Sequence, residues 1–163
     1  MVNFKETDSQ SEIQRRLQAE IKNYLNEISQ VDKESEEYLE QGNFREAKPF
    51  TEEAVEFVEE LIREHNFRIK QCYHNSQKAV LSYPEKLQYV EGYTISTQVP
   101  IPIQHAWVEF EGSIFEITLK HGPKIETNSV YFGKAYSSKR VISKVSNCES
   151  TGPLAGINSW NNY

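Results

Sequence analysis

Residues 105–118 decide the fold, and they read HAWVEFEGSIFEIT from His105 to Thr118. Apolar and polar side chains alternate on both sides of the dipeptide Glu111-Gly112. Alternation with a period of two predicts strands, and a glycine-containing two-residue turn joins antiparallel strands directly. The stretch therefore predicts a hairpin that places the strand of His105 beside the strand of Glu116.

The same period extends outward from this hairpin over the second half of the chain. Short runs rich in β-branched and aromatic residues are separated by turn residues, which is typical of strands. The predicted strands cover residues 89–95, 107–110, 113–119, 130–132 and 140–145. They predict an antiparallel, meander-like sheet from residue 87 onward.

The first half of the chain is helical by its pattern. Apolar residues recur at steps of three and four from Ile13 to Ile28, which places one apolar stripe on a long helix. The stripe weakens over residues 32–37, where the helix either continues exposed or breaks before Tyr38. Residues 42–47 resemble a tetratricopeptide turn, but no second copy follows, so an ordinary helical hairpin is favoured.

A second helix is predicted after Thr51, because acidic residues follow this candidate cap and apolar residues recur from Ala54 to Ile62. We expect it to pack against the first helix. A third helix is predicted from Tyr73 to Leu81, ending before Pro84, with Cys72 at its beginning. The predicted class is α+β, with a helical hairpin appendage (1–65), a core (66–146) and a loop-rich tail (147–163).

Composition narrows the functional classes. The 163 residues carry a formal charge of −6 without a basic cluster, which argues against nucleic-acid binding and favours an acidic protein or a cationic substrate. Two cysteines make no disulfide framework, and no apolar run reaches the ~20 residues that span a bilayer. The first residues also lack the apolar core of a signal peptide. We expect a soluble, cytoplasmic protein without membrane contact, whose oligomeric state the sequence leaves open.

A thiol, an imidazole and a carboxylate follow one another as Cys72, His105 and Glu116. Nucleophilic catalysis by cysteine needs these three types: a thiolate that attacks, a base that forms it and an acid that holds the base. A helix N-terminus also favours the thiolate at Cys72. Backbone amides near Cys72, with the Gln71 side chain, are the candidate oxyanion donors. Trp107 either shields this site from water or fills the core.

This order of residues resembles the transglutaminase-like branch of the papain-like thiol enzymes. The matching segments are Cys72, Val90-Glu91-Gly92-Tyr93, the run from His105 to Glu109, and Glu116-Ile117-Thr118. The resemblance covers residues 66–133 and implies a Cys72–His105–Glu116 triad, with Tyr93 and Trp107 at the cleft. Glu116 stands where the family usually has aspartate, and Ile117 stands where it has proline.

The resemblance implies an amide hydrolase, a peptidase or glutamine amidase, that acts on a protein or peptide through a thioester and needs no cofactor. Transfer of the acyl group to an amine is the related alternative. A third hypothesis is an inactive binding module, in which the helical hairpin captures a partner. A further hypothesis is that the helical hairpin is an inhibitory or substrate-recruiting arm on an active enzyme.

Each residue also has a purely structural interpretation. A cysteine that opens an apolar helix is most often a small buried hydrophobe. His74 lies close to Cys72 and suggests zinc together with His105, but no second cysteine follows at ligand spacing, so no metal is expected.

Overall fold

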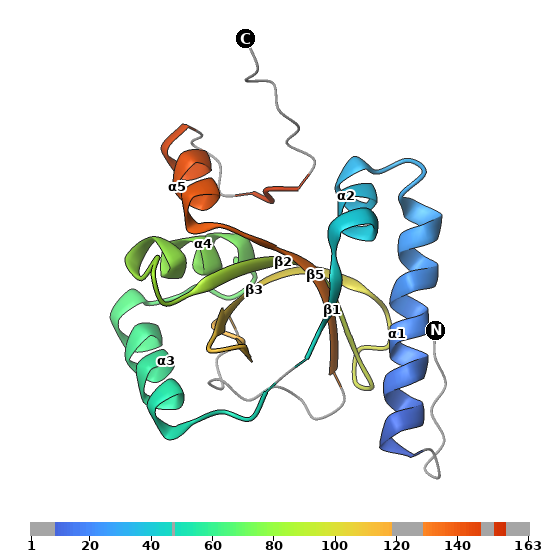
Figure 1. The fold of residues 1–163 in the computed structure, drawn as a ribbon, viewed down its shortest axis with the longest axis horizontal. Helices are drawn as coiled ribbons and strands as arrows, with labels where there is room; N and C mark the ends of the chain where they lie inside the picture. Colours follow the sequence, from blue (N-terminus) through green and yellow to red (C-terminus); the bar gives the residue numbers. More distant parts are fainter. Residues whose placement is uncertain (1–8, 47, 119–128, 148–151, 156–163) are drawn as a thin grey trace.

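The computed structural model describes residues 9–46, 48–118, 129–147 and 152–155. These residues form helices on an antiparallel sheet, so the predicted α+β class is confirmed (Figure 1). The helices are α1 (Gln10–Ile28), α2 (Lys33–Gln41), α3 (Glu52–His65), α4 (Cys72–Ser82) and α5 (Ser138–Asn147). The strands are β1 (Asn43–Arg45), β2 (Gln88–Ser96), β3 (Ile103–Phe110), β4 (Ser113–Phe115) and β5 (Ser129–Tyr136).

The strand order across the sheet is β1-β5-β2-β3-β4, and every neighbouring pair is antiparallel. Strands β2, β3 and β4 form the expected meander. Strand β5 departs from it, because it returns to the free edge of β2 and separates β2 from β1. The most N-terminal strand therefore belongs to the same sheet as the predicted core.

The predicted hairpin at residues 110–113 is confirmed. Phe110 pairs with Ser113 at the end of the β3–β4 ladder. Glu111 and Gly112 both have positive φ angles, 52° and 79°, as a tight two-residue turn with the twist of its strands requires. This turn sets the register that carries Glu116 back alongside β3.

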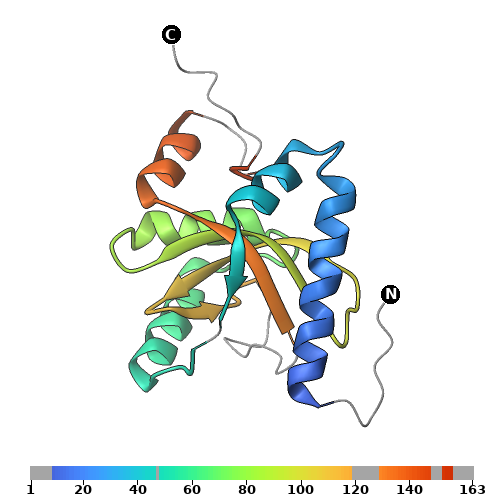
Figure 2. The ribbon, with the colours of Figure 1, turned by 45° about the vertical axis from the view of Figure 1, so that its right-hand side comes forward.

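The helices cover one face of the sheet at its two ends. At one end α3, α4 and α5 pack on a cluster that includes Tyr89, Val108 and Phe115. At the other end α1 and α2 pack on a cluster that includes Tyr93 and Phe132. Figures 1 and 2 show α1 and α3 on opposite sides of the molecule.

The expected packing of the second long helix against the first is therefore wrong. The buried residues of α3 face α4 and the β3–β4 hairpin, and those of α1 face α2, β2 and β5. The physical reason is β1, which leaves α2 at Gly42, pairs with β5 and carries the chain across the sheet. The polar segment near residue 32 is a break, where Asp32 caps α2 by accepting from the backbone N–H of Ser35 at 2.9 Å.

The predicted strand at residues 140–145 is also wrong, because this segment lies in α5. Val141 and Val145 are four residues apart, so a helix places both on one face. Val141 is fully buried and Val145 packs against the same cluster. The predicted tail at 147–163, with Cys148 and Trp160, lies mostly outside the described residues. Within this tail, residues 152–155 are described, and they pack on the body of the protein.

The opposite face of the sheet is concave and has its own small core of Val90, Trp107, Ile114 and Tyr131. Arg45 of β1 reaches across this face to Glu109 of β3. Its Nε donates to Oε1 at 2.9 Å and its Nη2 to Oε2 at 2.6 Å. Since β5 and β2 lie between these two strands, this bidentate pair requires a strongly curled sheet.

Among the described helices, none is long and apolar enough to cross a membrane.

Candidate active site

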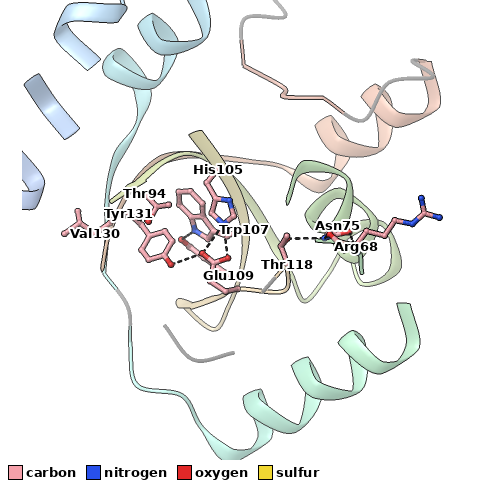
Figure 3. Close-up of polar contacts among 10 residues, drawn as sticks. Arg68, Asn75, Thr94, His105, Trp107, Glu109, Thr118, Val130 and Tyr131 are labelled. Carbon is pink, nitrogen blue, oxygen red and sulfur yellow. Dashed lines mark hydrogen bonds and ion pairs between the residues drawn. The ribbon is translucent and has the colours of Figure 1, made fainter. Parts of the chain in front are cut away.

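Cys72 is the first residue of α4, at the end of a loop that Asn75 fixes. The Asn75 side chain accepts from the backbone N–H of Arg68 at 3.2 Å and donates to the Arg68 carbonyl at 2.7 Å. It also donates to Oγ1 of Thr118 at 3.2 Å (Figure 3). One buried amide thus connects the loop before Cys72 to the segment that follows β4.

His105 and Glu116 come from the two arms of the β3–β4 hairpin. His105 lies in β3, and Glu116 is the first residue after β4. The imidazole Nε2 lies 2.8 Å from Oε2 and 3.0 Å from Oε1 of Glu116. Only 3% of Glu116 is exposed, so this contact is protected from water.

The thiol of Cys72 lies beside the imidazole of His105. Both groups line the same cavity, and each shifts the pKa of the other. Because Nε2 of His105 is engaged by Glu116, Nδ1 is the ring nitrogen left for the sulfur. The predicted Cys72, His105 and Glu116 are therefore brought together in the order that nucleophilic catalysis requires.

Tyr131 of β5 holds the carboxylate of Glu116 in place. Its hydroxyl donates to Oε1 of Glu116 at 2.8 Å. Its ring packs edge-on against Trp107, with ring centroids 5.2 Å apart (Figure 3). The sequence left residues 131–133 open between an edge of the cleft and an ordinary core strand, and Tyr131 does line the cavity that contains Cys72.

The electrostatics of the pair favour an imidazolium. Burial opposes the charge on His105, but Glu116 and the thiol outweigh it and raise the pKa of His105 to about 10. Burial likewise opposes the charge on Glu116, yet the charge of His105 and the hydrogen bonds from His105 and Tyr131 lower its pKa. The buried pair is thus ionised at neutral pH.

The thiol has the opposite tendency to an ordinary buried cysteine. Burial of Cys72 alone would raise its pKa, but His105 and the backbone N–H groups of Ala106 and Tyr73 lower it overall. A lowered thiol pKa beside a raised imidazole pKa favours a thiolate–imidazolium pair, the reactive form of a cysteine nucleophile.

Cys72, His105 and Glu116 line a cavity of about 510 Å³. Its wall comes from the loop before α4, from β2 and β3 with their connection, and from the start of β5. The lining residues are Ile69, Lys70, Cys72, Thr94, Ile95, Ser96, Val99, Ile103, Gln104, His105, Glu116, Thr118, Ser129 and Tyr131. A substrate in this cavity would contact the thiol directly.

The remaining predicted site residues lie elsewhere. Trp107 is fully buried below the site, with its ring 6.2 Å from that of His105 and nearly parallel to it. Its Nε1 donates to Oε1 of Glu109 at 3.2 Å. Trp107 therefore supports the imidazole from the concave core and does not line the cavity.

Tyr93 and Gln71 are also outside the lining of this cavity. The hydroxyl of Tyr93 lies 3.0 Å from Oγ of Ser35, under α1 and α2. Gln71 is the N-cap of α4, where its side chain makes no capping hydrogen bond, and it lines a separate polar cavity that also includes His74. His74 is thus not beside Cys72 and His105 in one cavity.

Among residues 9–46, 48–118, 129–147 and 152–155, no cluster of three or more histidine, cysteine, aspartate or glutamate side chains forms a metal site. Comparison with protein-family models, with curated proteins and with solved structures found no match for this chain. Interpretation of the site therefore depends on its own geometry.

Proposed function

We propose that this protein is a thiol-dependent amide hydrolase that acts on a protein or peptide through a thioester intermediate. One observation carries the proposal: Cys72, His105 and Glu116 line one cavity large enough for a substrate group, and the imidazole of His105 lies 2.8 Å from the carboxylate of Glu116. The lowered pKa of Cys72 and the raised pKa of His105 support it.

In the first half of the reaction, the Cys72 thiolate attacks the carbonyl carbon of the amide. The tetrahedral intermediate collapses as the His105 imidazolium gives its proton to the leaving nitrogen. The carbon–nitrogen bond breaks, an amine departs and a thioester remains on Cys72. Glu116 keeps the ring oriented and stabilises its charge before the proton leaves.

In the second half, neutral His105 accepts a proton from a water molecule that attacks the thioester. The carbon–sulfur bond then breaks, so that a carboxylic acid leaves and the thiolate–imidazolium pair is restored. For both tetrahedral intermediates we assign the oxyanion to backbone N–H groups at the start of α4. The helix dipole favours negative charge there, and Gln71 makes no side-chain cap that would compete for these donors.

The test is the rate at which iodoacetamide alkylates Cys72 as a function of pH. All proteins would carry Cys148→Ser so that Cys72 is the only thiol. We expect alkylation that remains fast below neutral pH and that slows at least tenfold in His105→Ala, because the imidazolium no longer stabilises the thiolate.

His74→Ala is the matched control, since His74 is close in sequence to Cys72 but lines a different cavity. This variant should keep the pH profile of the parent protein. A thiol that reacts no faster than free cysteine, and is indifferent to His105, would overturn the proposal and favour the inactive binding module.

A further inference from the structure

Exposed aliphatic side chains gather at the mouth of the Cys72 cavity. Ile69, Val99 and Ile103 line the cavity and are 51%, 42% and 43% exposed, and Ile101 between the last two is 50% exposed. Single exposed aliphatic residues are normal, but a contiguous group around a cavity marks a binding surface. This group is called the aliphatic rim below, and comprises Ile69, Val99 and Ile103.

Local hydrogen bonds hold each part of the aliphatic rim in place. Ile69 follows Arg68, whose backbone N–H and carbonyl are both bonded to Asn75. Val99 lies in a turn in which its N–H donates to Oγ of Ser96 at 3.0 Å and its carbonyl accepts from the Ser96 N–H at 3.2 Å. These hydrogen bonds fix the backbone on which Ile69 and Val99 are presented to the cavity.

The third rim residue is positioned by the same strand as the imidazole. Ile103 lies on β3 two residues before His105 and pairs with Thr94 of β2. Since strand side chains alternate between faces, Ile103 and His105 share a face. A group that contacts Ile103 is thereby brought next to the reacting centre.

Charge is scarce on the part of the cavity wall that the described residues form. Among those residues, outside Cys72, His105 and Glu116, Lys70 is the lining residue that carries a charge. Deeper in the wall, Ile95 is buried and extends the apolar surface inward. Such a wall stabilises an apolar group by removing it from water, and offers little to a strongly charged one.

We propose that the aliphatic rim is a specificity site for a substrate that carries a large aliphatic group beside the scissile amide. The inference rests on the proposed function, because it assigns the substrate class of the same site. It predicts discrimination between reagents that differ only in an aliphatic chain.

The experiment compares alkylation of Cys72 by iodoacetamide and by N-hexyl iodoacetamide in the Cys148→Ser protein. Each rate is divided by the rate of the same reagent with glutathione, which removes intrinsic differences in reactivity. We expect the normalised rate to be about tenfold or more higher for the hexyl reagent, and to saturate with its concentration, because several methylene groups leave water.

Two matched triple variants locate the preference. Ile69→Ser with Val99→Ser and Ile103→Ser should reduce the ratio of the two normalised rates to near one, because the hexyl chain loses its apolar contacts. Val31→Ser with Leu81→Ser and Ile142→Ser changes three exposed aliphatic residues outside the cavity and should retain the preference.

Equal normalised rates in the parent protein, or equal losses in both triple variants, would overturn the specificity site. This failure is distinguishable from failure of the proposed function, which shows as slow iodoacetamide labelling that is indifferent to His105. The ratio of the two normalised alkylation rates does not depend on the thiol pKa. It therefore tests the specificity site whether or not Cys72 is an activated thiol.

Discussion

Tyr131 and Glu116 meet through a single hydrogen bond of 2.8 Å that crosses the concave face of the sheet. The hydroxyl of Tyr131 donates to the same carboxylate oxygen that lies 3.0 Å from Nε2 of His105. In the strand order, β2 and β3 separate the strand of Tyr131 from the hairpin arm of Glu116. The acid of the candidate triad is therefore fixed from two directions by distant parts of the chain.

Tyr131→Phe should lower the free energy of unfolding by about 1.5–3 kcal/mol, the usual contribution of a hydrogen bond to a charged group. The change removes one donor from a buried carboxylate and keeps the aromatic ring. Urea unfolding at neutral pH measures it. In a Glu116→Gln background the same change should cost much less, and equal costs in both backgrounds would show that the two side chains are not coupled.

Glu116→Gln should lower the pKa of His105 below its value of about 10, since the carboxylate charge is a principal cause of that rise. Titration of the His105 ring signals by NMR measures the pKa directly. Alkylation of Cys72 at pH 6 should slow about tenfold in parallel. An unchanged His105 pKa would contradict the assigned role of Glu116.

Glu116→Asp tests the length of the side chain. The shorter acid keeps its charge but cannot maintain both the 2.8 Å contact with His105 and the 2.8 Å contact with Tyr131. We expect a His105 pKa between those of the parent protein and Glu116→Gln. A value equal to the parent's would show that the backbone adapts to the shorter acid.

A second buried carboxylate gives a stability prediction with a defined pH window. Glu91 is fully buried on β2 and accepts from the backbone N–H groups of Leu154 at 2.6 Å and Ala155 at 2.9 Å. Burial raises its pKa from 4.5 to about 7. The folded protein therefore binds more protons than the unfolded chain between these values, and its stability falls as pH rises through them.

Glu91→Gln should remove this dependence, because the amide is neutral and its oxygen can still accept from both N–H groups. Between pH 5 and pH 8 the variant should gain roughly 2–3 kcal/mol of stability relative to the parent, from the two pKa values and about 1.4 kcal/mol per pKa unit. Urea unfolding at the two pH values measures the gain. A difference in the free energy of unfolding between the two proteins that is the same at pH 5 and pH 8 would contradict the raised pKa of Glu91.

Gly133→Ala should destabilise the protein by about 2–3 kcal/mol through overpacking. A Cβ at this position would lie 2.6 Å from the Glu91 carbonyl oxygen and 2.7 Å from Cη2 of Trp107. Thermal unfolding measures the loss. Because Trp107 lies below His105, alkylation of Cys72 should slow in the folded variant as well, and an unchanged melting temperature would show that β5 can shift freely.

The sequence predicted those relationships that one local rule determines. The two-residue turn at Glu111-Gly112 fixes the register of the strands that it joins. The proximity of His105 to Glu116 therefore follows from the position of each residue relative to this turn. The start of α4 at Cys72 followed from the apolar run before Pro84. The contact between α4 and β3 is not local, and the family resemblance supplied it.

The hydrogen bond from Tyr131 to Glu116 could not be predicted in this way, because it depends on the place of β5 between β1 and β2. The only sequence signal of Tyr131 is an aromatic residue in a strand. The three-residue β1 gave no periodic signal, and its pairing with β5 separates α1 from α3. The Arg140–Val145 segment was misassigned because β-branched residues suggested a strand, although the four-residue spacing of its valines favours a helix.

The position of β5 also orders events during synthesis. Cys72, His105 and Glu116 all leave the ribosome before Tyr131, and β1 has no strand partner until β5 arrives. A nascent chain that already contains all three reactive groups still lacks the strand that closes the sheet around its acid. The hydrogen bond from Tyr131 that holds the acid in place can therefore form only after residue 131 has been synthesised.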